Sequence, residues 1–238
     1  MKNIPLLIGT LVGTLALVFG IAFFFGRAET PESVDPTKFR TGTNHVLSAE
    51  QTSFSDMATP SATPEASSSD NQASPSAEKK IVTVVEFSDL QCPACKIAAP
   101  IRDQIRAAHP GQVEFVFHYY PLTQIHANAL LAAQAVEAAS KFNEFWQYHD
   151  VLFEKQEEWA ELSSNQAKEK LIQYAVDLKI DKDGFTQELN SVTVKSAVQS
   201  DINLGNEINI SATPTFFVDG KQVSAPDVAK TVSDILGS

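Results

Sequence analysis

The fold is constrained most by the junction at residues 81–95, where a strand-forming run leads into a cysteine pair. Residues 81–87 read Ile-Val-Thr-Val-Val-Glu-Phe, a short β-branched run that is typical of a buried strand. The sequence Cys92-Pro93-Ala94-Cys95 follows after a short gap. Proline suits the first position of a helix, where its missing N–H is not needed. The pattern therefore predicts a strand, a short loop and a helix with Cys92 at its N-cap.

The rest of the C-terminal part, residues 80–238, alternates between strand and helix patterns, which predicts an α/β domain. At 159 residues it is long enough to bury a core without structural disulfides. The predicted elements are a helix over 93–108, a strand over 113–119, a helical stretch over 125–207 with breaks near 143, 163, 181 and 190, a hairpin over 215–223 turning at Asp219-Gly220, and a helix over 226–236.

The chemistry of the cysteine pair follows from its position. At a helix N-cap, Cys92 faces unpaired backbone N–H groups and the positive end of the helix dipole, and both lower a thiol pKa. Cys95 lies one turn later and can close a disulfide with Cys92. These are the only two cysteines of the chain. The arrangement therefore favours thiol–disulfide exchange.

Two alternatives to exchange remain less favoured. A structural zinc site requires four ligands, and no second cysteine pair is present. A purely structural disulfide would close a loop of only four residues, which constrains an unfolded chain very little.

The N-terminal residues 1–27 predict a membrane anchor. Residues 3–26 carry no charge and, as a helix, would reach about 36 Å, enough to cross a hydrocarbon core. The apolar core of a cleavable signal peptide is shorter, although small residues at 26–28 leave cleavage open. Lys2 before the segment favours an N-terminus in the cytoplasm, which would place the remaining chain outside the cell at the membrane.

Residues 28–79 predict a flexible linker. They are rich in Ser, Thr, Pro and Ala, and such a tract cannot bury enough apolar surface to offset its ordering entropy. As a coil of 52 residues, the linker would reach about 40 Å. Its larger apolar residues are able to dock transiently on the domain; they are Phe39, Val46, Leu47 and Phe54.

The charge balance limits the class of partner. The chain has 18 basic and 29 acidic residues, for a net charge of −11. Nucleic-acid binding depends on a basic surface, so the balance argues against a nucleic-acid partner.

The C-terminal domain resembles the DsbA-like thiol–disulfide oxidoreductases of the thioredoxin superfamily, specifically the membrane-anchored bacterial type. The resemblance covers nearly all of residues 81–238. It rests on V-V-E-F-S-D-L-Q-C-P-A-C, Y-P-L-T-Q-I-H-A-N-A-L-L-A-A-Q-A, F-W-Q-Y-H-D-V-L-F and A-T-P-T-F-F-V-D-G, of which the first and last are specific in combination. It implies a thioredoxin fold with a helical insertion between the second strand and the cis-proline loop, preceded by one transmembrane helix and a disordered linker.

The resemblance also implies catalytic roles for several residues. Cys92 would be the exposed nucleophile and Cys95 the buried resolving cysteine. Pro214 matches the cis-proline beside the disulfide, and Thr213 would present backbone groups to an extended substrate. Glu86 matches a buried acid that relays a proton to or from Cys95. A partly exposed glutamate at the strand end is the alternative for Glu86.

Pro93 and Ala94 stand between the cysteines and would lie beside a bound substrate. Ala94 departs from the best-known family members, which carry histidine there and use it to stabilise the thiolate. Alanine cannot donate a side-chain hydrogen bond, so we expect a weaker oxidant than the strongest family members. A Cys92 pKa below about 4 would contradict this expectation.

The function implied is the introduction of disulfides into reduced, unfolded secreted proteins, with reoxidation by a quinone-linked membrane partner. No metal or organic cofactor is implied, and a monomer is expected because no separate dimerisation domain is visible. Two rival functions remain. The first is a reductase or isomerase with the same residues, and the second is a tethered binding or chaperone module without catalysis.

Overall fold

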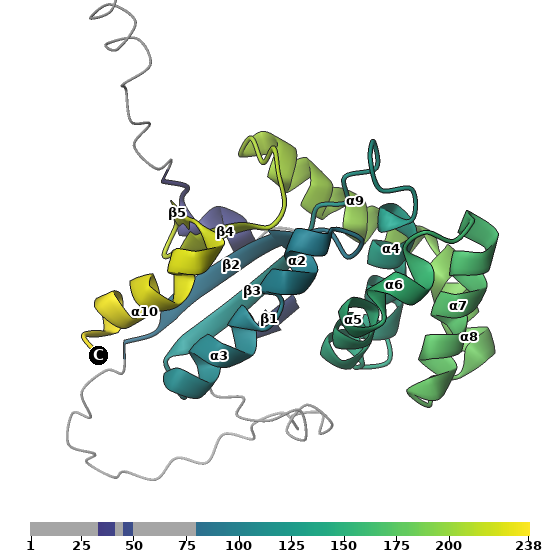
Figure 1. The fold of residues 1–238 in the computed structure, drawn as a ribbon, viewed down its shortest axis with the longest axis horizontal. Coiled ribbons are helices and arrows are strands. Elements are labelled where there is room, and N and C mark those ends of the chain that lie inside the picture. The colour runs from purple at the N-terminus through teal and green to yellow at the C-terminus, as the bar shows by residue number, and fades with distance from the viewer. Residues whose placement is uncertain (1–32, 41–44, 50–79) are drawn as a thin grey trace, which may run out of the picture. The chain divides into compact units, whose positions relative to one another are not determined.

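The computed structural model describes residues 33–40, 45–49 and 80–238 (Figure 1). The predicted anchor, residues 1–27, lies outside the described residues, as does most of the predicted linker. In the part of the chain that is described, no helix is both long enough and apolar enough to cross a membrane.

A five-stranded mixed sheet in the order β1-β3-β2-β4-β5 forms the centre of the domain. Its strands are β1 (His45–Leu47), β2 (Val82–Ser88), β3 (Val113–Tyr119), β4 (Thr215–Val218) and β5 (Lys221–Val223). The central strands β2 and β3 are parallel, and the other neighbouring pairs are antiparallel. The two predicted strands and the hairpin are confirmed. At the hairpin turn Asp219 and Gly220 both have positive φ, 46° and 81°, as a two-residue turn with right-handed strand twist requires.

The helix predicted over residues 93–108 is in fact two helices, α2 (Pro93–Ala98) and α3 (Ile101–Ala108). Pro100 separates them because its ring nitrogen has no hydrogen to donate to the carbonyl of Lys96, one turn earlier. At the C-terminus the predicted helix starts with a short 3-10 turn, η3 (Ala225–Asp227), and continues as α10 (Val228–Leu236).

A helical insertion separates β3 from the loop before β4, as the resemblance implied (Figure 1). It consists of α4 (Ala129–Ser140), α5 (Phe145–Glu154), α6 (Gln156–Trp159), α7 (Ser164–Asp177), α8 (Lys182–Asn190) and α9 (Val192–Glu207). The helices end near the predicted breaks, and one further break falls at Lys155. The buried Arg102 ties the insertion to α3, because its guanidinium pairs with Asp150 at 2.9 Å and lies 4.8 Å from the ring centre of Trp146.

Alternate residues of β2 face two different cores. Val82 and Val84 pack in the larger core, which also contains Cys95 and apolar residues of α3, α10 and the insertion. Val85 and Phe87 pack in a smaller core on the other face, against the C-terminal end of α9. The even-numbered side chains of β2 therefore point toward Cys95.

The prediction of a flexible linker over residues 28–79 is wrong for residues 33–40 and 45–49, which are part of the domain. Residues Pro36–Arg40 form a 3-10 helix, η1, and β1 pairs with β3 as an edge strand. Phe39 is buried in the smaller core, with its ring 5.0 Å from that of Phe217, and its carbonyl accepts a hydrogen bond from His118 Nε2 at 2.9 Å. The composition of the segment suggested that the entropy cost of ordering it would exceed the gain from burial. The burial of these apolar side chains offsets that cost.

Replacing Phe39 with alanine is expected to lower the free energy of unfolding by about 3–5 kcal/mol, because it leaves a cavity in a packed core. Denaturant unfolding of the full chain measures the effect. Thr37→Ala, an exposed change two residues earlier, is the matched control and is expected to cost at most about 0.5 kcal/mol. Equal losses for the two variants would mean that the segment docks only transiently.

Candidate active site

The cysteine pair lies where β2 gives way to α2. The strand ends at Ser88, and Cys92 is the N-cap residue of α2 with extended backbone angles of −72° and 123°. Pro93 occupies the first helical turn, as predicted. Both cysteines are free thiols in this structure. Cys92 is 7% exposed and Cys95 is 0% exposed, so only Cys92 meets the surface.

The surroundings of Cys92 stabilise its thiolate and lower its pKa to about 5. The largest cause is a hydrogen bond from the Cys95 thiol, and the backbone N–H groups of Cys95 and Ala94 and the side chain of Thr213 add to it. Partial burial acts in the opposite direction but is outweighed. A thiol with this pKa is almost fully ionised at neutral pH and is a good leaving group.

The pKa of Cys95 is shifted in the opposite direction. Burial raises its pKa strongly, and the hydrogen bond to Cys92 and the charge of Glu86 add to the effect. The backbone N–H of Asp89 donates to Cys95 Sγ at 3.5 Å. The two thiols therefore differ widely in acidity, and Cys92 is the one that carries the negative charge.

The Glu86 side chain leaves β2 on the face of the sheet that packs toward the two cysteines. It is only 3% exposed, which excludes the alternative of a partly exposed glutamate at the strand end. Burial raises its pKa to about 7, while Ser88 and the charge of Arg102 act in the opposite direction. One of its carboxyl oxygens, Oε1, has no hydrogen-bond partner among the described residues. A carboxyl with this pKa can hold or release a proton at physiological pH.

The loop before β4 closes the site from the other side. The Thr213–Pro214 peptide bond is cis, and the Cys92 thiol lies 3.5 Å from the carbonyl oxygen of Thr213. The structure thus brings together the predicted residues Glu86, Cys92, Cys95 and Thr213–Pro214 at one end of β2. Their roles in catalysis stay predictions.

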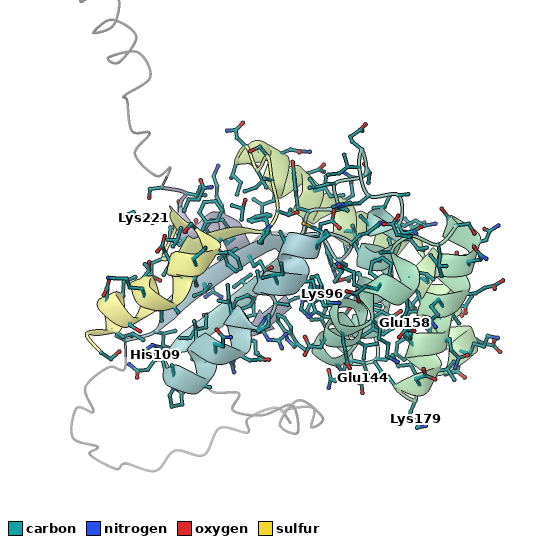
Figure 2. All side chains as sticks on the ribbon, in the orientation of Figure 1. Lys96, His109, Glu144, Glu158, Lys179 and Lys221 are labelled. Atoms are coloured by element: carbon teal, nitrogen blue, oxygen red, sulfur yellow. The ribbon has the colours of Figure 1, made fainter. Side chains whose placement is uncertain are left out.

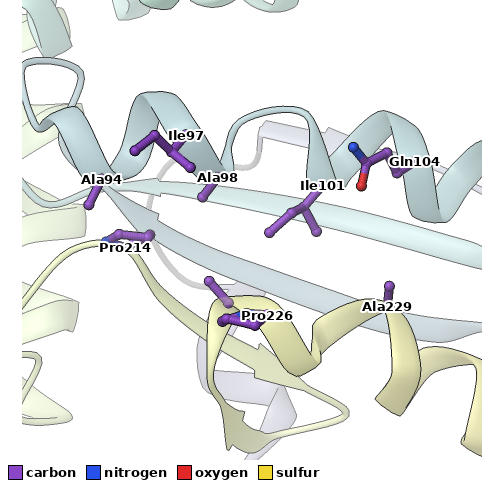
Figure 3. A pocket seen from close by; sticks show the side chains of 9 residues that line it. Ala94, Ile97, Ala98, Ile101, Gln104, Pro214, Pro226 and Ala229 are labelled. Atoms are coloured by element: carbon purple, nitrogen blue, oxygen red, sulfur yellow. The ribbon is translucent and has the colours of Figure 1, made fainter.

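An apolar cavity of about 390 Å³ opens beside the pair (Figure 3). Its walls come from α2 and α3 on one side and from the cis-proline loop, η3 and α10 on the other. The lining residues are Ala94, Ile97, Ala98, Ile101, Gln104, Pro214, Ala225, Pro226 and Ala229. Of the predicted substrate contacts, Ala94 lines this cavity and Pro93 is exposed next to it.

Buried amide side chains, which the sequence did not single out, fix the backbone around Cys92. Gln156 of α6 donates from Nε2 to the carbonyl oxygens of Leu90 and Cys92, at 2.8 and 3.1 Å. Gln91 accepts from the backbone N–H of Asn128 and donates to the carbonyl of Ala160, both at 2.7 Å. The insertion therefore holds the loop that carries Cys92. Glutamine has no local sequence signal for such contacts, because its partners are far away in the chain.

Charged groups also flank the pair. Lys96, next to Cys95 in sequence, points toward the insertion, where its ammonium contacts Glu157 at 2.6 Å (Figure 2). The buried Asp89 carboxylate accepts from the backbone N–H groups of Gln91 and Leu122 and contacts His126 Nδ1 at 2.7 Å.

Within the described residues, no cluster of three or more His, Cys, Asp or Glu side chains suited to a metal ion is present.

Comparisons with known proteins agree with this geometry. The thioredoxin family model matches residues 74–237. Two curated relatives are Na⁺/H⁺ antiporters: NhaA 3 of Salinispora tropica, 34% identical over 145 residues, and NhaA 1 of Mycolicibacterium gilvum, 32% identical over 149 residues. Each match covers 61% of this chain, but the chain spans only about a fifth of the length of these relatives, 21% and 23%.

Solved structures give matches over a larger share of both chains. Oxidised BdbD from Bacillus subtilis is 25% identical, with a TM-score of 0.62 over 88% of this chain and 100% of that one. DsbA from Xylella fastidiosa is 19% identical, with a TM-score of 0.56 over 67% of this chain and 86% of that one, and shares the fold. The chain therefore belongs to the thioredoxin family, and it shares its fold with the DsbA structures.

Proposed function

We propose that this protein introduces disulfide bonds into reduced, unfolded proteins outside the cytoplasm, while residues 1–27 tether it to the cell membrane. The observation that carries the proposal is the difference between the two thiols. Cys92 has a pKa of about 5 and reaches the surface, whereas Cys95 is fully buried with a raised pKa. A stabilised Cys92 thiolate favours the reduced form of the pair, which makes the disulfide form an oxidant.

The exchange proceeds in two steps. A substrate thiolate attacks the Cys92 sulfur of the disulfide form, the Cys92–Cys95 bond breaks, and Cys95 leaves and takes up a proton. A second substrate thiolate then attacks the mixed disulfide at the substrate sulfur. Cys92 leaves as its stabilised thiolate, and the substrate keeps the new disulfide. The substrate loses two electrons and the cysteine pair gains them.

The surroundings of Cys92 suit an extended substrate segment. The backbone of Thr213 is adjacent to the Cys92 thiol and is available for strand-like hydrogen bonds. The apolar cavity under Ala94 and Pro214 offers room for an apolar side chain next to the substrate cysteine. Such contacts hold an unfolded chain without requiring one particular sequence.

Continued turnover requires an acceptor for the electrons that the pair collects. We propose a quinone-linked thiol oxidase in the same membrane, which would reoxidise Cys92 and Cys95. We propose further that the protein acts as a monomer and requires neither a metal nor an organic cofactor, since both electrons reside on the two sulfurs.

The experiment that tests the direction of electron flow is the reduction potential of the pair in the full chain, held in detergent and equilibrated against glutathione. We expect a value between about −120 and −180 mV, the range of oxidants and isomerases. A value near about −270 mV, as in thioredoxin, would instead identify a tethered reductase. Cys92→Ser is the control: it should abolish exchange, and retained biological activity in this variant would favour a binding module without catalysis.

A further inference from the structure

A serine of β2, Ser88, follows Glu86 by two residues and precedes the residue whose backbone N–H contacts the buried Cys95 thiol. Glu86 and Ser88 are two residues apart on one strand, so both side chains leave the same face of the sheet. That face packs into the larger core, which contains Cys95. The residue after Ser88 donates its backbone N–H to Cys95 Sγ at 3.5 Å, which places the thiol beside the Ser88 end of the strand.

The Ser88 hydroxyl is buried and makes no hydrogen bond of ordinary length and angle with the described residues. Ser88 is 0% exposed, and neither its Oγ nor Glu86 Oε1 has a hydrogen-bond partner among the described residues. Buried polar atoms are nearly always paired, because an unpaired one lowers the stability of the fold. Two such atoms on the same face, next to a reactive thiol, therefore call for an explanation in function.

The Ser88 side chain also influences the acidity of both neighbours. Burial is the main influence on Glu86 and on Cys95 and raises the pKa of each, while Ser88 lowers both pKa values. This is the effect of a hydroxyl hydrogen that approaches a carboxylate or a thiolate. A serine hydroxyl can donate one hydrogen and accept another at the same time, which is the requirement for passing a proton on.

We propose that the Ser88 hydroxyl relays the proton between the Cys95 thiol and the Glu86 carboxyl. The inference rests on the proposed function, because the relay has a role only if the pair exchanges disulfides. Cys95 has no exposed surface, so solvent does not reach its sulfur directly. A route through the side chains of β2 gives the buried thiol a path for its proton.

The relay works as follows when the pair closes from a mixed disulfide with glutathione on Cys92. The Cys95 thiol gives its proton to Ser88 Oγ while the Ser88 hydroxyl gives its own to the Glu86 carboxylate. The Cys95 thiolate attacks the Cys92 sulfur, the bond between Cys92 and glutathione breaks, and the Cys92–Cys95 bond forms. Glutathione leaves as a thiolate and takes a proton from water. Cys95 is oxidised, and the glutathione sulfur is reduced.

Closure of this mixed disulfide is a suitable test because it is intramolecular. The reduced full chain, in detergent, is mixed rapidly with excess oxidised glutathione at a series of pH values, quenched in acid and analysed by mass spectrometry. In the parent, the closure rate should rise through pH 7, the pKa of the accepting carboxyl. Ser88→Ala should lose this inflection and close at least about tenfold more slowly at pH 8, since general acid–base groups contribute about 10²–10⁴ in rate.

Three further variants separate a relay from a packing role. Ser88→Thr keeps the hydroxyl and should keep the inflection. In a Glu86→Gln background, Ser88→Ala should cause no additional slowing, because both residues serve one path. Ser140→Ala removes a hydroxyl at the end of α4, far along the chain from the site, and should behave as the parent.

Two results would overturn the relay while leaving the proposed function intact: an inflection near pH 7 that persists in Ser88→Ala, or slowing by Ser88→Ala that adds to that of Glu86→Gln. A parent chain that does not form the mixed disulfide at all would instead overturn the proposed function, and the relay with it.

Discussion

Replacing Cys95 with alanine is expected to abolish disulfide donation and to raise the pKa of Cys92. Without Cys95 no intramolecular disulfide can form, so the variant has nothing to donate to a reduced substrate. The Cys95 thiol is also the largest cause of the lowered Cys92 pKa of about 5. A hydrogen bond to a charged group is worth about 1.5–3 kcal/mol, which corresponds to a rise of about one to two pKa units.

The ultraviolet absorbance of the thiolate, followed against pH, measures the Cys92 pKa in this variant. Non-reducing gels measure the loss of the intramolecular disulfide. Mixed disulfides between Cys92 and glutathione should accumulate, because Cys95 is no longer present to release them. Cys92→Ala is the control and should give neither the titration nor the adducts. An unchanged Cys92 pKa in Cys95→Ala would assign the effect to the helix N-terminus instead.

Replacing Glu86 with glutamine is expected to stabilise the reduced protein at pH 8 and to leave its stability at pH 4 nearly unchanged. Burial raises the pKa of Glu86 from 4.5 to about 7. Between these values the unfolded chain releases its proton while the folded chain keeps it, so stability is full below pH 4.5 and is lost as pH rises to 7. The loss amounts to about 3 kcal/mol, and glutamine removes it because it does not ionise.

Denaturant unfolding of the reduced chain across this pH range measures the effect. The parent should lose stability as pH rises from 4.5 to 7, and Glu86→Gln should have a flatter profile. Glu169→Gln, which changes an exposed carboxyl on α7, is the matched control and should follow the parent. Parallel profiles for Glu86→Gln and the parent would mean that Glu86 ionises normally in the fold.

Features of the fold that depend on a local sequence signal were predictable. The Asp219-Gly220 dipeptide specifies a two-residue turn by its backbone conformation, and Pro93 marks a helix start by its missing N–H, so the hairpin and the position of Cys92 followed directly. The break at Pro100 was also encoded locally, but the surrounding helical pattern outweighed it in the prediction.

Features that depend on distant partners were not predictable in this way. η1 and β1 are too short to show a periodic pattern, and Phe39 packs against Phe87 and Phe217, which are distant from it in the chain. Gln156 and Ser88 take their importance from groups brought near them by the fold. A glutamine or serine in isolation has no pattern that distinguishes a buried contact from a solvated surface position.

The docking of residues 33–40 and 45–49 also limits how far the domain could travel from the proposed anchor at residues 1–27. Residues 50–79 join two segments that are fixed on the same domain. Their length therefore does not add to the distance between the domain and the anchor. Only residues 28–32 remain as a connection, and five residues span at most about 18 Å. If residues 1–27 form the proposed membrane anchor, a domain on so short a connection stays next to the bilayer, and the proposed membrane partner is then present at an effective concentration in about the millimolar range.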